Sequence, residues 1–443
     1  MRRRRNIWRS ILKAVKGKRL FGGVHIRDEK HLVCENATEV PPEPSEVYIS
    51  MQQSAGKPAV PCVEKGQKVK EGQLIATADG AISSNVFASV AGEIKDITQM
   101  MSPSGTEDTV IVITSDGSGD KQYLTPLDDP SAQEITKRIE EAGIVGMGGA
   151  GFPAAVKDTP KNKVDTLILN GAECEPYLAC DHRLMVEHTE EIVRGARYLK
   201  KALGVTDIII GIEKNKPDCI AAFEKYDDVK VVSLARRYPM GSEKHIIYSC
   251  TGRKVKAGQL PADVGVIVHN VGTVYAVCQA IELGKPLYER EITISGRAVK
   301  QPKNLWVKVG TSVKELVELC GGEAENPKKV IDGGPMTGVA MANYESYITK
   351  MTGGILLMTA KEADCLSPTP CLNCGKCADV CPMHLMPMQT AFYSSAGDFD
   401  AAAKLGGTMY CIECGACEYV CPAKRPLIQA IRKTKAAVRA NKN

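Results

Sequence analysis

The sequence predicts a multidomain protein of the α/β plus β class, with a small helical domain at its C-terminal end. Three observations support this class. Short strands separated by turns fill residues 42–115, strands and helices alternate between residues 131 and 283, and two cysteine motifs of the same spacing stand in the last quarter. The chain has 443 residues, of which 44% are hydrophobic and 25% are charged, so it can form several cores in one soluble protein.

The net charge of +5 is concentrated at the two ends of the chain, in MRRRRNIWRSILKAVKGKR and IRKTKAAVRANKN. Basic termini on a near-neutral body predict an acidic partner or an anionic membrane surface. Trp8, Ile11, Leu12 and Val15 have the spacing of a short amphipathic helix on such a surface, although a solvated basic arm fits as well. The sequence has neither a long apolar run nor a signal-peptide pattern, so it predicts no membrane span and no export.

The first predicted domain covers residues 42–124 and follows a basic N-terminal segment at 1–41. VEKGQKVKEGQLI and VFASVAGEI place glycines at turns and apolar residues at alternating positions. This pattern resembles the half-barrel of lipoyl and biotinyl carrier domains, which carry their cofactor on a lysine at a hairpin tip. No lysine occurs between Lys70 and Lys95, so we expect a lipoyl-like half-barrel with a structural role.

An α/β domain is predicted at residues 125–287, and a β-grasp-like unit of the SLBB type at 288–361. In the α/β domain, TLILNG, DIIIGI, VKVVSL and GVIVHN are buried strands of a mostly parallel sheet, and MVEHTEEIVRGARYLKKAL and VGTVYAVCQAIEL are helices beside them. The β-grasp-like unit contains the run DGGPMTG at residues 332–338. This run is glycine-rich enough to approach a phosphate, but we expect an ordinary β-turn.

Eight of the seventeen cysteines lie in the last predicted domain, residues 362–443, as two copies of C-x2-C-x2-C-x3-C-P. Three thiolates at this spacing hold one face of a [4Fe–4S] cluster while the fourth reaches a second cluster, as in two-cluster bacterial ferredoxins. A structural zinc site uses cysteine pairs and has no need of the third cysteine. The expected ligands are Cys371, Cys374, Cys377 and Cys421 for one cluster, and Cys411, Cys414, Cys417 and Cys381 for the other.

The long interval between the two motifs predicts helical spacers, as in the helical ferredoxin domains of multi-subunit oxidoreductases. The other nine cysteines are scattered, which favours metal ligation in a reducing compartment over a disulfide framework. Two clusters in series conduct electrons one at a time. Another redox group must therefore supply or accept these electrons.

The stretch GMGGAGFPAAVK, residues 146–157, contains a formal G-x-G-x-x-G at Gly146, Gly148 and Gly151. A Rossmann turn needs a strand directly before the first glycine and an acidic residue about twenty positions later. Glu173 meets the second condition, but a predicted helix precedes the loop, and Phe152-Pro153 interrupts the helix that should follow. On its own, the motif leaves a Rossmann dinucleotide site as a weak alternative.

The loop and the segments after it resemble the flavin- and NADH-binding subunit of respiratory complex I. The matching segments are GMGGAGFPAAVK, LILNGAECEP, YPMGSEKHI and VIVHNVGTVYAV, in this order. The resemblance implies that FMN is bound by Gly146, Gly148, Gly149, Lys157, Asn170, Glu173 and Asn270, and NADH by Phe152, Glu175 and Glu243. The glycines would let backbone amides approach the flavin. Met147, Ala172 and Tyr177 depart from that family's arginine, aspartate and glycine, so we expect no flavin contact from Ala172 and a differently shaped nicotinamide entrance.

Taken whole, the chain resembles the C subunit of the Rnf-type membrane complex. The resemblance lies in FGGVHIRDEKH near the start, the half-barrel, the flavin domain, the β-grasp-like unit and the two cysteine motifs. It implies an NADH-dependent oxidoreductase component that passes electrons between NAD(H), FMN and two [4Fe–4S] clusters, with no side-chain acid or base needed for hydride transfer. It also implies a peripheral position on the cytoplasmic side of the cell membrane, beside membrane subunits that move ions, with ferredoxin reached through a partner subunit and no nucleic-acid partner.

Two alternatives stay open. A soluble relative of the same family would pass NADH electrons to a corrinoid or another acceptor, although the arginine-rich start and the GGVH segment favour the Rnf type. A flavin-free electron-transfer scaffold would keep the clusters and use the α/β domain only for docking. Ala172 and Tyr177 are the residues that favour the scaffold, and flavin absorbance in the purified protein would exclude it.

Overall fold

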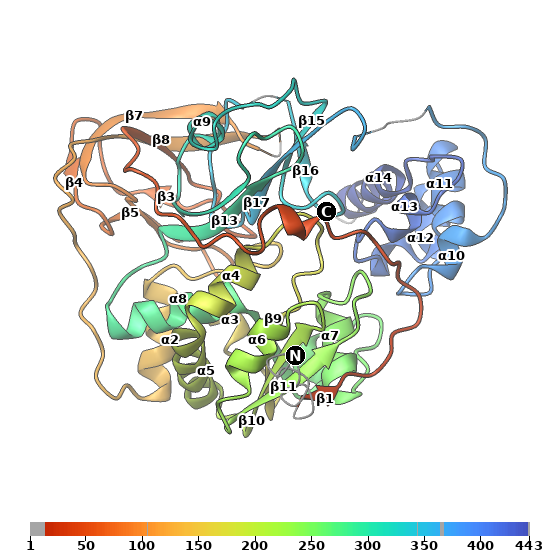
Figure 1. The fold of residues 1–443 in the computed structure, drawn as a ribbon, viewed down its shortest axis with the longest axis horizontal. Coiled ribbons are helices and arrows are strands. Elements are labelled where there is room, and N and C mark those ends of the chain that lie inside the picture. Colours follow the sequence, from red (N-terminus) through yellow and green to blue (C-terminus); the bar gives the residue numbers. More distant parts are fainter. Residues whose placement is uncertain (1–13, 104, 343, 364–366, 442–443) are drawn as a thin grey trace, which may run out of the picture.

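The computed structural model describes residues 14–103, 105–342, 344–363 and 367–441. Figure 1 shows three parts: a sheet covered by helices at the bottom, a β-rich part at the top, and a helical C-terminal part at the right. The N-terminal segment, drawn in red, runs from the sheet past the helical part and on to the β-rich part (Figure 1). This segment therefore passes all three parts.

A five-stranded parallel sheet with the order β1-β11-β10-β9-β12 is the centre of the α/β part. Its strands are apolar on both faces, because successive residues point to opposite helical layers: Ile208 and Ile210 of β10 enter one core and Ile209 the other. The strands are β1 (Val15–Lys16), β9 (Thr166–Gly171), β10 (Asp207–Glu213), β11 (Val229–Leu234) and β12 (Val266–Asn270). The helices are α2 (Ala132–Glu141), α3 (Ala154–Lys157), α4 (Cys180–Glu187), α5 (Thr189–Leu203), α6 (Pro217–Phe223), α7 (Glu243–Thr251), η2 (Pro261–Val264) and α8 (Val271–Glu282).

Local sequence explains where several of these helices begin and end. The hydroxyl of Ser131 accepts from the N–H of Glu134, and the Glu134 carboxylate accepts from the N–H of Ser131, which is a capping box at the start of α2. The helix predicted over residues 185–203 is divided at His188 into α4 and α5. α5 ends at Gly204, whose φ of 64° lies in the left-handed region that glycine adopts without strain because it has no Cβ.

Two antiparallel sheets form the half-barrel, with the orders β2-β8-β7-β4 and β3-β5-β6. The loop between β5 and β6 contains no lysine and packs on the end of α2. There the hydroxyl of Ser84 donates to the carbonyl of Gly143 at 3.0 Å, and Lys350 Nζ donates to the carbonyls of Asn85 and Gly143 at 2.7 and 2.8 Å. The strands are β2 (Glu46–Ser50), β3 (Val60–Pro61), β4 (Lys68–Val69), β5 (Leu74–Thr77), β6 (Val86–Phe87), β7 (Gly92–Met101) and β8 (Glu107–Ser115).

A mixed sheet with the order β14-β13-β17-β15-β16 follows, and one helix packs against it. β13 and β17 are parallel, and the other neighbours are antiparallel. The residues of the run at 332–338 form the hairpin loop between β15 and β16, so the predicted turn is present. The elements are β13 (Glu289–Ser295), β14 (Lys303–Lys308), α9 (Val313–Leu319), β15 (Lys329–Asp332), β16 (Val339–Met341) and β17 (Gly354–Met358).

The helical C-terminal part repeats one unit twice. Each unit has a cysteine loop, a one-turn helix and a longer helix after the Cys-Pro pair, and α11 and α12 provide the predicted helical spacer. Gly375 and Gly415 begin the one-turn helices with φ values of 76° and 75°. The elements are α10 (Lys376–Asp379), α11 (Pro387–Ser395), α12 (Phe399–Gly406), η3 (Thr408–Tyr410), α13 (Ala416–Tyr419) and α14 (Leu427–Ala440).

Residues 20–33, which we call the N-terminal strap, connect all three parts. The N–H of Gly23 donates to the carbonyl of Val380 in the helical part at 2.8 Å. Val24 forms an isolated bridge with Tyr238 of the α/β part. The strap ends in η1 (Lys30–Leu32) beside the turn that follows β9.

The predicted amphipathic helix at Trp8, Ile11 and Leu12 lies outside the described residues. Val15, its last predicted apolar position, belongs to the edge strand β1. Within the part of the chain that the structure describes, no helix combines the length and the apolar character needed to cross a membrane.

Candidate functional site

Two adjoining cavities lie at the carboxyl ends of β9 and β12. Their volumes are about 390 and about 310 Å³, and the residues that line both are Gly148, Gly149, Asn170, Gly241 and Asn270. Asn170 and Asn270 are partners in register on the two strands. Ligands of parallel α/β sheets bind at this edge, where strands end and helices begin. We call the larger space the turn cavity and the smaller one, which contains Lys157, the lysine cavity.

The glycine loop is closed by contacts on both sides. The N–H of Gly146 donates to the carbonyl of Phe152 at 2.9 Å, and the N–H of Met147 donates to Thr273 Oγ1 of α8 at 3.0 Å. The short helix α3 follows only after Pro153. This arrangement lacks the strand, tight turn and long helix of a Rossmann site.

Gly148 and Gly149 present bare backbone to the cavities. A Cβ on Gly148 would lie 2.9 Å from Asn270 Nδ2, whereas no atom lies within 4 Å of a Cβ on Gly149. Among the described residues, the N–H groups of Gly148 and Gly149 have no hydrogen-bond partner. These two donors are therefore free to bind an anionic or carbonyl group of a ligand.

The ammonium of Lys157 lies at the end of α3 and forms an ion pair across the lysine cavity. Its Nζ lies 2.6 Å from Oε1 of Glu243, the first residue of α7, and both side chains are partly exposed. A phosphate binds an ammonium through charge-assisted hydrogen bonds as a carboxylate does. A phosphorylated ligand would therefore compete with Glu243 for Lys157.

The carboxylate of Glu173 is engaged within the protein. Oε1 accepts from the N–H groups of Asp181 and His182 at the start of α4, at 2.7 and 3.4 Å, and Oε2 lies 3.0 Å from Lys30 Nζ. Glu173 itself has a φ of 42°, in the left-handed region. Because both oxygens already accept hydrogen bonds, the main effect of this side chain is to hold the turn that follows β9.

Asp181 is a buried carboxyl that the sequence did not mark. Asn270 Nδ2 donates to Asp181 Oδ2 at 2.8 Å, while Asn270 Oδ1 accepts from the N–H of Gly272 and caps α8. Burial, and then the nearby Glu173, raise the pKa of Asp181 to about 6. The carboxyl thus fixes the Asn270 amide at the edge shared by the two cavities.

The loop at residues 332–338 forms a wall of the turn cavity opposite the glycine loop. The Thr337 hydroxyl and the Met336 N–H donate to the two oxygens of Glu175 at 2.7 and 3.1 Å, and a Cβ on Gly334 would overlap that carboxylate. Burial raises the pKa of Glu175. The run is therefore a cavity wall as well as the predicted turn, and its glycine content was the signal in the sequence.

The eight motif cysteines gather into two sets with opposite exposure. The open set, Cys371, Cys374, Cys377 and Cys421, lines a cavity of about 870 Å³. The closed set, Cys381, Cys411, Cys414 and Cys417, lines a space of about 20 Å³. Backbone N–H groups donate to Cys371 Sγ and Cys411 Sγ at 3.4 and 3.3 Å, as expected around thiolate ligands.

The closed set packs against the residues of the turn cavity. Cys414 shares a small core with Tyr238, and Met336 packs at the edge of that core. The Tyr238 hydroxyl donates to Glu175 Oε1 at 3.2 Å, and a Cβ on Gly415 would lie 2.8 Å from the Met336 carbonyl. The cavity wall and the closed set are therefore in direct contact.

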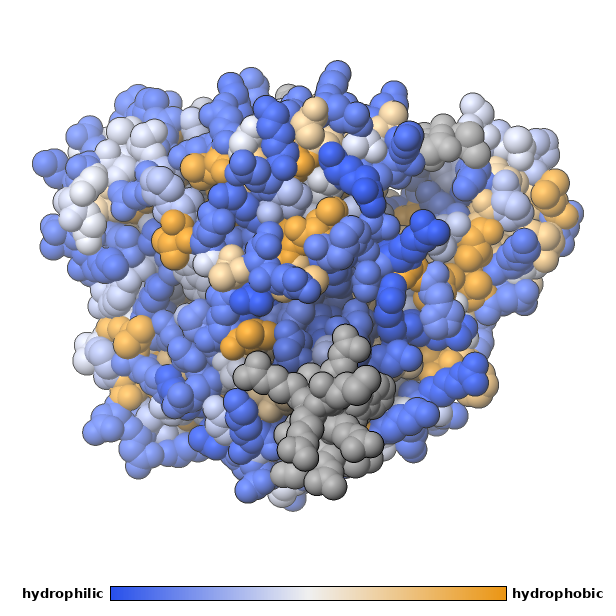
Figure 2. All heavy atoms as spheres, viewed as in Figure 1, coloured by the Kyte–Doolittle hydropathy of each residue, from blue (hydrophilic) through white to orange (hydrophobic). Residues whose placement is uncertain are grey.

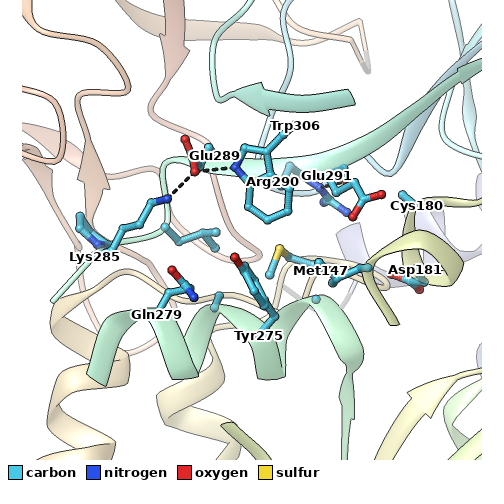
Figure 3. Close-up of a pocket in the computed structure, with 15 residues that line it drawn as sticks. Met147, Cys180, Asp181, Tyr275, Gln279, Lys285, Glu289, Arg290, Glu291 and Trp306 are labelled. Atoms are coloured by element: carbon cyan, nitrogen blue, oxygen red, sulfur yellow. Dashed lines mark hydrogen bonds and ion pairs between the residues drawn. The ribbon is translucent and has the colours of Figure 1, made fainter. Parts of the chain in front are cut away.

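A third, narrow cavity of about 40 Å³ lies behind the glycine loop and shares Met147 and Asp181 with the turn cavity. Figure 3 shows Lys285 and Trp306 both directed at the Glu289 carboxylate, away from Asp181. The space holds only a few water molecules and is too small for a nucleotide. These residues form the floor beneath the glycine loop.

The residues present fit a flavin nucleotide and two clusters. The paired cavities offer several hundred Å³, two free backbone donors and a lysine at the carboxyl edge of a parallel sheet. Each cysteine set supplies four thiolates around one space, which is the donor set of a [4Fe–4S] cluster.

Every residue predicted to bind FMN or NADH lines one of the two main cavities. Glu173 and Glu175 line the turn cavity; Gly146, Phe152, Lys157 and Glu243 line the lysine cavity; Gly148, Gly149, Asn170 and Asn270 line both. Tyr177, which departs from the complex I pattern, has a φ of 66°, a value that explains why glycine suits this position. Sequence reasoning missed Lys30, Asp181 and the loop at 332–338.

Four family patterns cover most of the chain. They are described as RnfC Barrel sandwich hybrid domain (residues 18–118), Nuo51 FMN-binding domain (139–279), SLBB domain (292–340) and 4Fe-4S dicluster domain (370–425). These matches confirm the predicted fold class and the predicted FMN and iron–sulfur cofactors.

Three curated relatives match over nearly the whole chain, and each is the C subunit of a multi-subunit complex. That of the proton-translocating ferredoxin:NAD(+) oxidoreductase complex of Clostridium ljungdahlii is 44% identical over 96% of this chain and 94% of its own. That of the ion-translocating oxidoreductase complex of Rhodobacter capsulatus is 42% identical over 92% and 81%. That of the Na(+)-translocating ferredoxin:NAD(+) oxidoreductase complex of Acetobacterium woodii is 41% identical over 95% and 97%.

Proposed function

This chain belongs to the family of C subunits of ion-translocating ferredoxin:NAD(+) oxidoreductase complexes, and we propose that it exchanges electrons between NAD(H), FMN and two [4Fe–4S] clusters. It is the oxidoreductase component of a multi-subunit complex. The observation that carries the proposal is the contact between the closed cysteine set and the wall of the turn cavity. This family membership favours the membrane-complex type over the soluble corrinoid-reducing alternative.

FMN would be held mainly by backbone and amide groups. The N–H groups at Gly148 and Gly149 would bind the polar edge or the phosphate of FMN. Lys157 would leave its ion pair with Glu243 and bind the phosphate instead. Asn170 and Asn270 are held in place by their own hydrogen bonds, so they present fixed polar groups at the shared edge of the cavities. Glu173 would act by holding the turn. Gly146 would contribute by closing the loop.

NADH would lie over the flavin near Phe152, Glu175 and Glu243. The Phe152 ring is 39% exposed and can stack on a ligand ring. When bound, FMN accepts hydride from NADH and releases electrons singly, so the residues of this chain need only orient the two rings and exclude water. No side chain of the site has to act as an acid or base in the hydride step.

The two clusters would act in order. The closed set lies against the turn cavity and would exchange electrons with the flavin. The open set faces outward, with Leu372 and Phe392 beside it at 66% and 67% exposure, and Figure 2 shows apolar side chains gathered on this helical part at the right. The open cluster would therefore exchange electrons with a partner subunit.

The partners would be membrane subunits of an Rnf-type complex, one of which passes electrons from ferredoxin. The chain would lie peripherally on the cytoplasmic side of the cell membrane, where its basic N-terminal segment meets anionic lipid or an acidic subunit. Electrons would run from ferredoxin to NAD+ in the ion-pumping direction. The names of the relatives, which couple ferredoxin:NAD(+) oxidoreduction to ion translocation, support this arrangement.

An anaerobic titration with NADH tests the proposal. The full chain, reconstituted with FMN and iron–sulfur clusters, is titrated while flavin absorbance and cluster EPR are recorded in one sample. Flavin bleaching followed by cluster reduction, or by cluster turnover with an added acceptor, is expected. A protein that binds about eight irons but neither binds FMN nor responds to NADH would be a flavin-free scaffold instead.

A further inference from the structure

One buried lysine of the N-terminal strap reaches the turn after β9. Lys30 is 5% exposed, and its Nζ donates to Glu173 Oε2 at 3.0 Å, to the Glu173 carbonyl at 2.8 Å and to the Leu178 carbonyl. An ammonium has three N–H donors, so all of them are used. The contacts join both ends of the turn, residues 173–178, to a segment that precedes it by more than a hundred positions in the sequence.

The positive charge of Lys30 is compensated by the carboxylate of Glu173. Burial lowers the pKa of Lys30, but Glu173 and, after it, Glu213 and Cys174 raise it, so that the pKa lies above its ordinary value. Among the described residues, Lys30 is the one cation that forms an ion pair with Glu173. Removing one partner of a buried pair leaves an uncompensated charge, which costs far more than removing both.

The same strap also touches the closed cysteine set. A Cβ on Gly22 would lie 2.9 Å from the carbonyl of Cys381, and the N–H of Gly23 donates to the carbonyl of Val380. The flavin turn and the loop of a cluster ligand are therefore held by one short segment. Lys30 holds both ends of the turn, and the Asp28 carbonyl of the strap accepts from the N–H of Tyr177 at 2.7 Å between them.

We propose that Lys30 is a positioning residue of the flavin site: it fixes the Glu173 turn, and through the strap it ties the shape of the turn cavity to the docked cluster domain. This inference rests on the FMN binding proposed above. Lys30 does not need to touch the flavin, because it acts through Glu173. It lies outside the complex I-type domain, so sequence matching to that domain does not reveal it.

The test uses the full chain with its clusters, stripped of FMN and titrated with FMN under anaerobic conditions. Lys30→Met is expected to raise the Kd for FMN, read from fluorescence quenching, by about tenfold or more. It is also expected to lower the flavin midpoint potential, because the unpaired Glu173 charge opposes electron uptake. The double variant Lys30→Met/Glu173→Gln buries no unpaired charge and should recover most of both changes.

Lys57→Met is the matched control, because Lys57 forms an exposed ion pair with Asp79 at 3.3 Å and should change neither readout. Unchanged FMN affinity and potential in Lys30→Met would overturn the inference while leaving the proposed function intact. If Lys30→Met does not fold, the double variant decides: a potential and Kd near those of the wild type support charge pairing, and a loss equal to that of the Glu173→Gln single variant contradicts it. Failure of the wild-type chain to bind FMN would instead overturn the proposed function.

Discussion

The two cysteine motifs have the same spacing and the same local backbone, yet they lie in opposite environments. In the open set Cys371 and Cys374 are exposed, whereas in the closed set Cys381, Cys414 and Cys417 are buried. The difference arises outside the motifs, since the closed set, which takes Cys381 from the first motif and three cysteines from the second, meets the strap and the loop at 332–338. In the proposed function, identical ligand chemistry would thus serve one cluster beside the turn cavity and one at the surface.

The comparison teaches that position, and not ligand type, distinguishes the two sets and would assign their proposed electron-transfer roles. A cluster enclosed by protein is screened from water, and burial and nearby N–H donors tune its potential. A cluster at the surface must remain reachable by another carrier. Two pairs of variants alter one set with the matching residue of the other set as the control, and two single variants alter the turn cavity beside the closed set.

Replacing one ligand in each set should give the largest effect. Cys414→Ser should leave flavin bleaching by NADH intact but isolate the open cluster, so that NADH no longer reduces it. Cys374→Ser should leave the closed cluster reducible and block only transfer to an outside acceptor. Iron analysis should give about four instead of about eight irons in both, and EPR after NADH addition separates them. Reduction of the remaining cluster in Cys414→Ser but not in Cys374→Ser would reverse the proposed order.

The glycines that begin α10 and α13 offer a finer comparison. Gly375→Ala and Gly415→Ala both place a side chain at positive φ, at a cost of about 1–2 kcal/mol. Gly415→Ala also directs its Cβ at the Met336 carbonyl, while the space around Gly375 is empty. Gly415→Ala should therefore lower the melting temperature more and slow reduction of the clusters by NADH. Equal effects in the two variants would show that the contact at Met336 has no role.

Gly149→Ala tests the flavin side of the comparison. Since no atom lies within 4 Å of the added Cβ, folding of the FMN-free protein should change by no more than about 0.5 kcal/mol. The same Cβ should intrude on bound FMN and weaken its binding by about tenfold, or about 1.4 kcal/mol. Thermal unfolding and FMN titration measure the two effects separately. An unchanged Kd would place the flavin elsewhere in the cavities.

Asp332→Asn should give the smallest effect, and one that depends on pH. Burial raises the pKa of Asp332 to about 6. The contribution of the protonated carboxyl to the free energy of unfolding is therefore complete below the unfolded pKa of about 4 and is lost as the pH rises through 6. The asparagine of the variant does not ionise, so its stability does not fall over this pH range. The difference in stability between the variant and the wild type should be smallest near pH 4 and should reach about 1 kcal/mol near pH 8, after allowance for water in the cavity. A stability difference that does not grow between these pH values would contradict the assignment.

Sequence patterns are most informative where the chemistry is local. The spacing of the cysteines predicts both cysteine sets, and the alternation of strands with helices predicts the parallel sheet. Asn170 and Asn270 stand at the carboxyl ends of two of its strands. Sequence patterns do not identify the partners of residues far apart in the chain. No pattern near Lys30 points to Glu173, and the glycines at 332–338 indicate a close approach without identifying Glu175. Such contacts depend on how the three parts of the molecule pack together, and a local sequence pattern does not predict that packing.

The strap also sets an order of events during synthesis. Gly23 leaves the ribosome more than three hundred residues before its hydrogen-bond partner Val380. Because domains fold as they emerge, the barrel and the α/β part can form long before this contact exists. Closure of the strap is then a late step. Until it occurs, the loop that carries Cys381 and the turn after β9 are not yet joined by one segment.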